Sequence, residues 1–124
     1  MTGKVERLHL LLPITISLAN ETSLSLEFVI DTGFTGALTL SEEVITHLQL
    51  PYLYSIPADL ADDTTVEVPI YEVKIIWEDK PLAVAVLGMG RRPLLGTALL
   101  NGHRLQADFA DEASVSITAL ETSE

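Results

Sequence analysis

The sequence predicts one mostly-β domain, and three observations lead to this prediction. Hydrophobic and polar residues alternate along most of the chain with the period of two that is typical of half-buried strands. Turn-forming residues separate these runs, and helical patterns are confined to two short segments. The chain has 124 residues, of which 48% are hydrophobic, so it is long enough for one core and too short for two domains. We therefore expect residues 1–124 to form a single domain.

The alternation predicts six strands, with a turn signal between most of them. The expected strands are residues 14–18, 24–30, 66–77, 82–87, 103–109 and 114–120. The expected turns are residues 20–22, 78–81, 101–102 and 110–113. The strand over residues 24–30 becomes more apolar toward its end, so we expect it to run into the interior and to end at Asp31.

Two short helices and one long loop complete the expected elements. Ser41 is expected to cap a helix that carries Glu42 and Glu43 near the positive end of its dipole. The buried side of this helix is expected to consist of Val44, Ile45 and Leu48. A second helix is expected over residues 97–100. Residues 52–65 are expected to form a long polar loop, which is a feature that often carries function.

Charge and composition exclude several classes of partner and cofactor. The 18 acidic and 7 basic residues give a net charge of −11, which disfavours nucleic acid and anionic membrane surfaces. The chain has no cysteine, and its three histidines are far apart in sequence. We therefore expect no disulfide, no thiol nucleophile, no metal site and no cofactor.

The N-terminal region is expected to be part of the folded domain. Polar residues interrupt its apolar stretch, and strand-like alternation follows directly, so we expect no signal peptide. No apolar run approaches the roughly 20 residues of a membrane span. These patterns predict a soluble protein in the cytoplasm.

Candidate chemistry is concentrated in residues 28–38. Asp31 directly follows an apolar strand, where an ionised carboxylate is unfavourable unless the surrounding structure compensates for it. Thr32 supplies a hydroxyl group next to this carboxylate. Gly33 and Gly36 permit a sharp turn and a close approach of another backbone. On these residues alone Asp31 is a candidate catalytic group, and a capped turn residue is the other interpretation.

This segment resembles the active-site loop of the retropepsin-like aspartic proteases. The resemblance rests on Phe28-Val29-Ile30-Asp31-Thr32-Gly33 and on the small and apolar residues that follow. Leu94-Leu95-Gly96, at the start of a short helix, matches the second signature of the family. Phe34 makes the loop similar to the small prokaryotic members that carry Asp-Thr-Gly-Phe. The resemblance implies an all-β, retropepsin-like closed β-barrel with one or two short helices.

The resemblance also implies an aspartic endopeptidase that hydrolyses peptide bonds and needs no cofactor. In this family two aspartates share a proton and activate one water. No other Asp in the chain is followed by Thr-Gly or Ser-Gly, so the expected enzyme is a homodimer with one Asp31 from each subunit. Thr32 and Gly33 complete the expected catalytic loop, with Thr32 bonding across the dimer.

A substrate flap is implied within residues 52–68. By analogy Ala61, Asp62 and Asp63 lie near its tip, where they would contact a peptide or protein substrate. A solvated loop is the other interpretation of Asp62 and Asp63.

Two other functions stay open at this point. The flap tip has no glycine, and Thr97 stands where retroviral members often have Arg. An inactive retropepsin-fold module for peptide binding or dimerisation is therefore one alternative, and a monomeric β-barrel without an active site is another. Several prominent residues are given structural roles: surface or strand-face positions for His9, His47 and His103, core positions for Tyr71 and Trp77, and a surface turn for Arg91 and Arg92.

Overall fold

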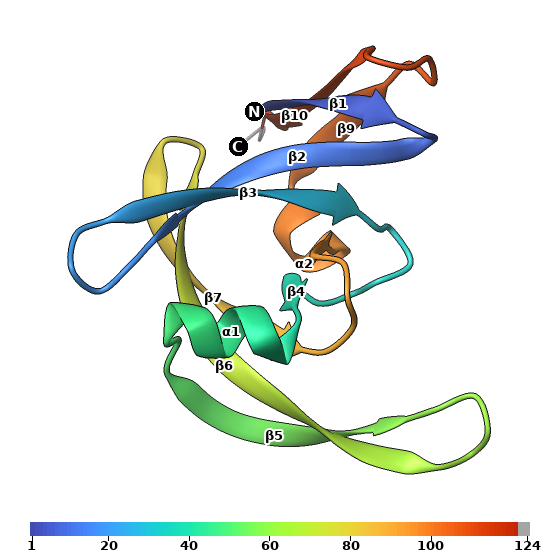
Figure 1. Cartoon of the computed structure of the whole chain (residues 1–124). Coiled ribbons are helices and arrows are strands. Elements are labelled where there is room, and N and C mark those ends of the chain that lie inside the picture. Colours follow the sequence, from blue (N-terminus) through green and yellow to red (C-terminus); the bar gives the residue numbers. More distant parts are fainter. Residues whose placement is uncertain (122–124) are drawn as a thin grey trace.

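The structure is a computed structural model that describes residues 1–121, within which ten strands form one sheet (Figure 1). The strands are β1 (Thr2–Glu6), β2 (His9–Ser17), β3 (Ser23–Ile30), β4 (Leu38–Leu40), β5 (Tyr52–Asp59), β6 (Thr65–Trp77), β7 (Lys80–Gly88), β8 (Leu94–Leu95), β9 (His103–Ala107) and β10 (Ser114–Ala119). Two short helices accompany them, α1 (Glu42–Leu48) and α2 (Thr97–Leu100). The mostly-β fold with two short helices is confirmed.

The order of the strands brings distant segments together. It is β5-β6-β7-β4-β8-β3-β2-β1-β10-β9, with an additional pairing between β2 and β6 that joins Ile16 to Ile75. Most neighbours are antiparallel, but β3 pairs with β8 and β4 pairs with β7 in parallel. As a result β8 lies between β3 and β4, immediately next to the segment that contains Asp31.

The core is built from the alternating apolar faces of the strands. Its largest fully buried side chains include Leu12, Ile14, Ile16, Phe28, Leu38, Leu40, Ile45, Ile75 and Ile117.

 Leu95, in the two-residue strand β8, is also completely buried. The strand β3 is exposed at its start and buried at Phe28 and Ile30, which confirms that it runs into the interior. Trp77 is buried and Tyr71 packs against the core, as expected from the sequence.

Helix α1 begins where its sequence predicts. The Ser41 hydroxyl oxygen accepts a hydrogen bond from the Val44 backbone N–H at 3.2 Å, which satisfies a free donor in the first turn. Gln49 adopts the left-handed conformation that ends the helix. Ile45 is fully buried, and Val44 and Leu48 pack against the core.

The prediction of a long polar loop over residues 52–65 is wrong. Residues Tyr52–Asp59 form strand β5, which pairs with β6 from Tyr52↔Tyr71 to Asp59↔Thr65, and the connecting turn is residues 60–64. Nearly all of β5 is exposed on both sides, so its sequence lacks the alternation that marks a half-buried strand. Pairing with β6 satisfies its backbone instead.

Three other strands were not expected, and the expected strand at residues 14–18 begins earlier, at His9. Strands β4 and β8 have three and two residues, and they exist because longer strands flank them. Strand β1 is held by β2 and β10, and the Met1 ammonium group donates to the Ile117 carbonyl at 3.0 Å. Within residues 1–121, neither helix is long and apolar enough to cross a membrane.

Candidate active site

Asp31 lies just beyond the end of β3, and its own loop orients its carboxylate. The backbone N–H of Asp31 donates to the Leu95 carbonyl at 2.9 Å, which continues the pairing of β3 with β8. The carboxylate oxygen Oδ1 accepts a hydrogen bond from the Gly33 N–H at 2.9 Å. The Phe34 N–H donates to the Asp31 carbonyl at 3.1 Å and closes the turn. The carboxylate is therefore held in one orientation at the end of a buried strand.

Thr32 and Gly33 form the exposed part of this turn. A Cβ atom on Gly33 would lie 3.2 Å from Asp31 Oδ1, so a side chain there would crowd the carboxylate. Within the described part of the chain, the Thr32 hydroxyl has no hydrogen-bond partner. The loop thus presents a carboxylate, a hydroxyl group and bare backbone to its surroundings.

The junction of β8 and α2 supports the Asp31 loop from behind. The Gly96 N–H donates to the Ala37 carbonyl at 2.9 Å, and the Thr97 N–H donates to the Phe34 carbonyl at 2.9 Å. A Cβ atom on Gly96 would lie only 2.2 Å from the Gly36 carbonyl oxygen and 2.5 Å from that of Phe34. Glycine at position 96 is therefore required by the close approach of two backbones. The two sequence signatures are in direct contact.

The expected flap residues lie in the turn of the β5–β6 hairpin. Ala61, Asp62 and Asp63 are exposed, and the Thr64 hydroxyl group donates to Asp62 Oδ1 at 2.6 Å. Hydrogen bonds from the Thr64 hydroxyl and backbone N–H lower the pKa of Asp62. Asp63 has a φ of 66°, a conformation that Asp adopts more readily than most residues. Within residues 1–121, no hydrogen bond joins this turn to the Asp31 loop.

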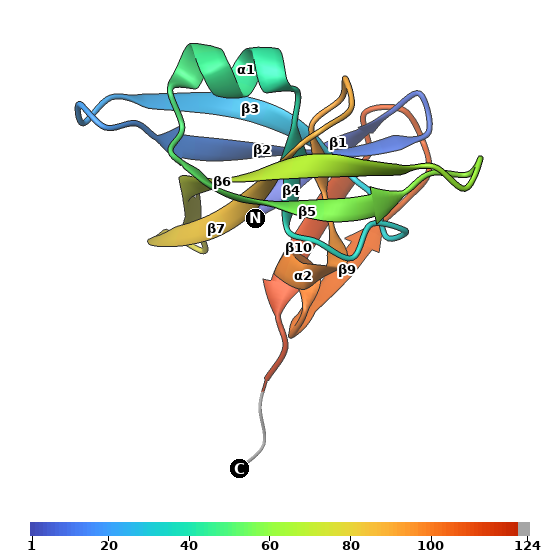
Figure 2. The same cartoon turned by 90° about the horizontal axis from the view of Figure 1, so that it is seen from below.

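The β5–β6 hairpin carries an unusual share of exposed apolar side chains. They lie on both of its strands and in its turn: Tyr52, Leu53, Tyr54, Ile56, Leu60 and Val66. Figures 1 and 2 show the hairpin extending past the body of the molecule on the same side as the β3–β4 connection that contains Asp31. Exposed apolar surface of this kind is typical of an interaction site.

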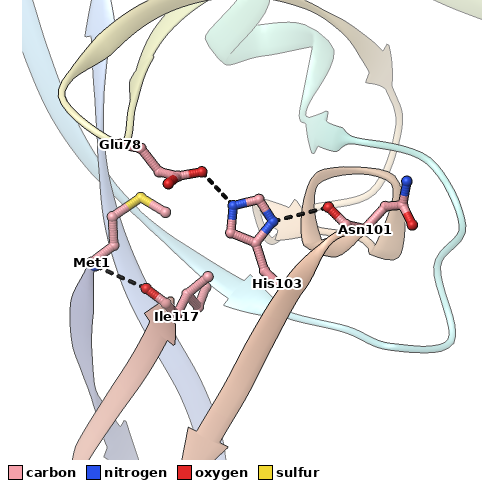
Figure 3. A network of polar contacts seen from close by, with 5 residues as sticks. All are labelled: Met1, Glu78, Asn101, His103 and Ile117. Atoms are coloured by element: carbon pink, nitrogen blue, oxygen red, sulfur yellow. Dashed lines mark hydrogen bonds and ion pairs between the residues drawn. The ribbon is translucent and has the colours of Figure 1, made fainter. Parts of the chain in front are cut away.

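A second polar cluster surrounds His103, at the start of β9 (Figure 3). Its Nδ1 lies 2.9 Å from the Asn101 carbonyl oxygen, and its Nε2 contacts the Glu78 carboxylate in the β6–β7 turn. Burial lowers the pKa of His103, but the hydrogen bonds to Glu78 and Asn101 and the charge of Glu78 outweigh it, so the pKa is raised. Both ring nitrogens face acceptors, which is the arrangement that suits an imidazolium. The cluster links two distant turns, and His103 is partly buried on strand β9, in agreement with the strand-face position expected for it.

The solved structures that are similar to this fold include two proteases. The EIAV protease complexed with the inhibitor HBY-793 has a TM-score of 0.54 and 18% identity, over 75% of this chain and 86% of that one. A retropepsin-like aspartic protease from Rickettsia conorii has a TM-score of 0.57 and 18% identity, over 98% of this chain and 91% of that one. No protein-family model and no curated protein matches the sequence. The chain therefore has the retropepsin-like fold.

Proposed function

We propose that this protein is an aspartic endopeptidase whose active site forms between two copies of the chain. The observation that carries this proposal is the Asp31 loop. It holds an oriented carboxylate at the end of a core strand, exposes Thr32 and Gly33, and is supported by the Gly96 junction. The retropepsin-like fold supports the same assignment.

Peptide hydrolysis at such a site uses two carboxylates with different roles. One carboxylate acts as the base that takes a proton from water, and the other donates a proton to the carbonyl oxygen of the scissile bond. Two Asp31 side chains at one site would share a single proton and titrate as a pair. In this proposal the Gly33 N–H keeps each Asp31 oriented toward the shared water.

A homodimer follows from the number of suitable aspartates. Asp31 is the only Asp in the chain that precedes Thr-Gly. Within residues 1–121, its carboxylate has no hydrogen bond or ion pair with another side chain. A second copy related by a twofold axis would supply the second carboxylate and a partner for the exposed Thr32 hydroxyl.

The β5–β6 hairpin is the proposed substrate flap. Its exposed apolar side chains would cover a bound peptide and keep water away from it. In this proposal Ala61, Asp62 and Asp63 lie at the flap tip, closest to the substrate.

The test is cleavage of a diverse peptide mixture between pH 4 and 7, followed by mass spectrometry. The variant Asp31→Asn keeps the size of the side chain and removes the base, so we expect its rate to fall by at least ~100-fold. The matched control is Asp79→Asn, which makes the same chemical change in the exposed turn between β6 and β7. Asp79 has a φ of 64°, which Asn also tolerates, so the control should fold and cleave as the wild type does.

The same experiment separates the proposal from its alternatives. Equal cleavage by wild type and Asp31→Asn would show that Asp31 is not catalytic. If the wild-type protein is folded and dimeric but cuts nothing, a peptide-binding or dimerisation module becomes the better interpretation. A monomer at all concentrations would contradict the shared site, since one chain supplies one Asp31.

A further inference from the structure

Three of the four arginines in this acidic chain line one hollow. Arg7 lies in the β1–β2 turn, and Arg91 and Arg92 lie in the connection between β7 and β8. Together with His9 they line a hollow of about 350 Å³. Positions 7 and 92 are far apart in sequence, and the fold brings them together. Because the chain has only 7 basic residues against 18 acidic ones, this local gathering of positive charge is distinctive.

The hollow adjoins the Asp31 loop along strand β3. Glu27 and Val29 line the hollow. The alternate residues of the strand, Phe28 and Ile30, point the other way and are buried in the core. Alternation along the strand therefore places the hollow on the side of β3 that continues to position 31. Two residues of strand span about 7 Å, so Val29 is that far from Asp31. The Val29 N–H also donates to the Pro93 carbonyl at 2.8 Å, which ties the arginine-bearing connection to β3.

The three guanidinium groups are available to an incoming anion. The ion pairs within residues 1–121 are Lys4 with Glu6 and His103 with Glu78, so none of these arginines is in one. Arg92 Nη1 lies 3.0 Å from His9 Nε2. Since arginine keeps its protons, the guanidinium donates this bond and the imidazole nitrogen accepts it.

The acidic groups near the hollow leave it with a positive excess. Glu6 also lines it, but its carboxylate is 3.8 Å from Lys4 Nζ. Asp111 Oδ1 accepts a hydrogen bond from the Arg7 backbone N–H at 3.1 Å. Glu27 is the remaining carboxylate of the lining. At ~0.15 M salt the screening length is about 8 Å, so these local charges outweigh the distant negative charge of the molecule.

We infer that this hollow binds an acidic side chain of the peptide substrate, within about three residues of the cleaved bond. The inference rests on the proposed function and gives it a substrate class. Guanidinium groups bind carboxylates through two parallel hydrogen bonds, which favours Asp or Glu over Asn or Gln.

The test begins with the cleavage sites found in a diverse peptide mixture, which should be enriched in Asp or Glu within three residues of the cut. The best substrate is then made in two forms that differ by Glu or Gln at the enriched position. Wild type should have at least ~10-fold higher kcat/KM for the Glu form, the size expected for a hydrogen bond to a charged group. The variant Arg91→Gln/Arg92→Gln should lose this preference, so that its kcat/KM values for the Glu and Gln forms become similar.

The matched control is Arg104→Gln, which removes the fourth arginine, exposed on β9 and outside the hollow. It should retain the preference for Glu. Cleavage without enrichment of acidic residues would overturn the inference and leave the proposed function intact. A double variant that changes dimer affinity but not peptide preference would also overturn it, because the arginines would then pair with a second copy. If the wild type cleaves nothing, both proposals fail.

Discussion

At the residue scale, the lack of a side chain at Gly96 lets the start of α2 contact the loop that follows Asp31. The Gly96 φ of −107° is available to any residue, so glycine is needed there for space rather than for backbone freedom. The atoms that a Cβ would meet are carbonyl oxygens of the Asp31 loop, at 2.2 and 2.5 Å, and backbone atoms cannot rotate away.

We predict that Gly96→Ala lowers the free energy of unfolding by about 1–3 kcal/mol, the range for overpacking a tight contact. The Asp31 loop must move to admit the methyl group, so peptide cleavage should fall as well. Urea denaturation measures the stability effect. The control is Gly102→Asn, at a position with a φ of 80° and no atom within 4 Å of the added Cβ. If Gly96→Ala matches wild type in both stability and cleavage, Gly96 is not in tight contact with the carbonyl oxygens of Phe34 and Gly36.

At the scale of elements, the His103 cluster connects the β6–β7 turn to the start of β9. When His103 is protonated, its Nε2–H donates to the Glu78 carboxylate and its Nδ1–H donates to the Asn101 carbonyl oxygen. The Trp77 ring packs edge-on against the imidazole, with 5.5 Å between the ring centroids. The ordinary pKa is 6.5 and the folded value is raised above it. The stabilisation is therefore complete below pH 6.5 and is lost as the pH rises through the folded pKa.

A double-mutant cycle with His103→Gln and Glu78→Gln tests this link. We expect a coupling free energy of about 1 kcal/mol at pH 6, a modest value because Glu78 is partly exposed. At pH 9 the coupling should shrink, because His103 loses its charge. Urea denaturation of the wild type, the two single variants and the double variant at pH 6 and pH 9 measures this coupling free energy. A coupling that grows with pH would mean that the imidazole pairs with Glu78 in its neutral form.

The β5–β6 hairpin is the element for which sequence patterns were least informative. Its strands are exposed where they leave the body of the molecule, so neither alternation nor a buried face marks β5. The hairpin turn at residues 60–64 was nevertheless anticipated by the position of Ala61, Asp62 and Asp63 in the implied flap. A family pattern placed the turn correctly where local periodicity predicted only a loop.

At the scale of the whole molecule, net charge opposes the assembly that the candidate site requires. Two copies bring a charge of 2 × (−11) = −22 into one particle. Salt screens this repulsion, so we predict that dimer affinity rises by at least about threefold between 0.02 and 0.5 M NaCl. Sedimentation equilibrium at the two salt concentrations measures it. Affinity that falls with salt would indicate attractive ion pairs across the interface, with Arg91 and Arg92 as the first residues to substitute.

By itself, the sequence determined the features that depend on neighbouring residues. Alternation placed the longer strands, Ser41 and the two glutamates after it placed α1, and the residues around Asp31 and Gly96 marked the two signatures. Local backbone preference and one-sided burial act within a few residues, so their imprint can be read along the chain.

Only the tertiary structure decided what lies next to what. The two-residue strand β8 exists because β3 and β4 pair with it from either side. Strand β5 exists because it pairs with β6. The same pairing places the Gly96 backbone against the Asp31 loop and gathers Arg7 and Arg92 around one hollow. Contacts between segments so distant in sequence follow from the order of strands in the sheet, and no local pattern encodes that order.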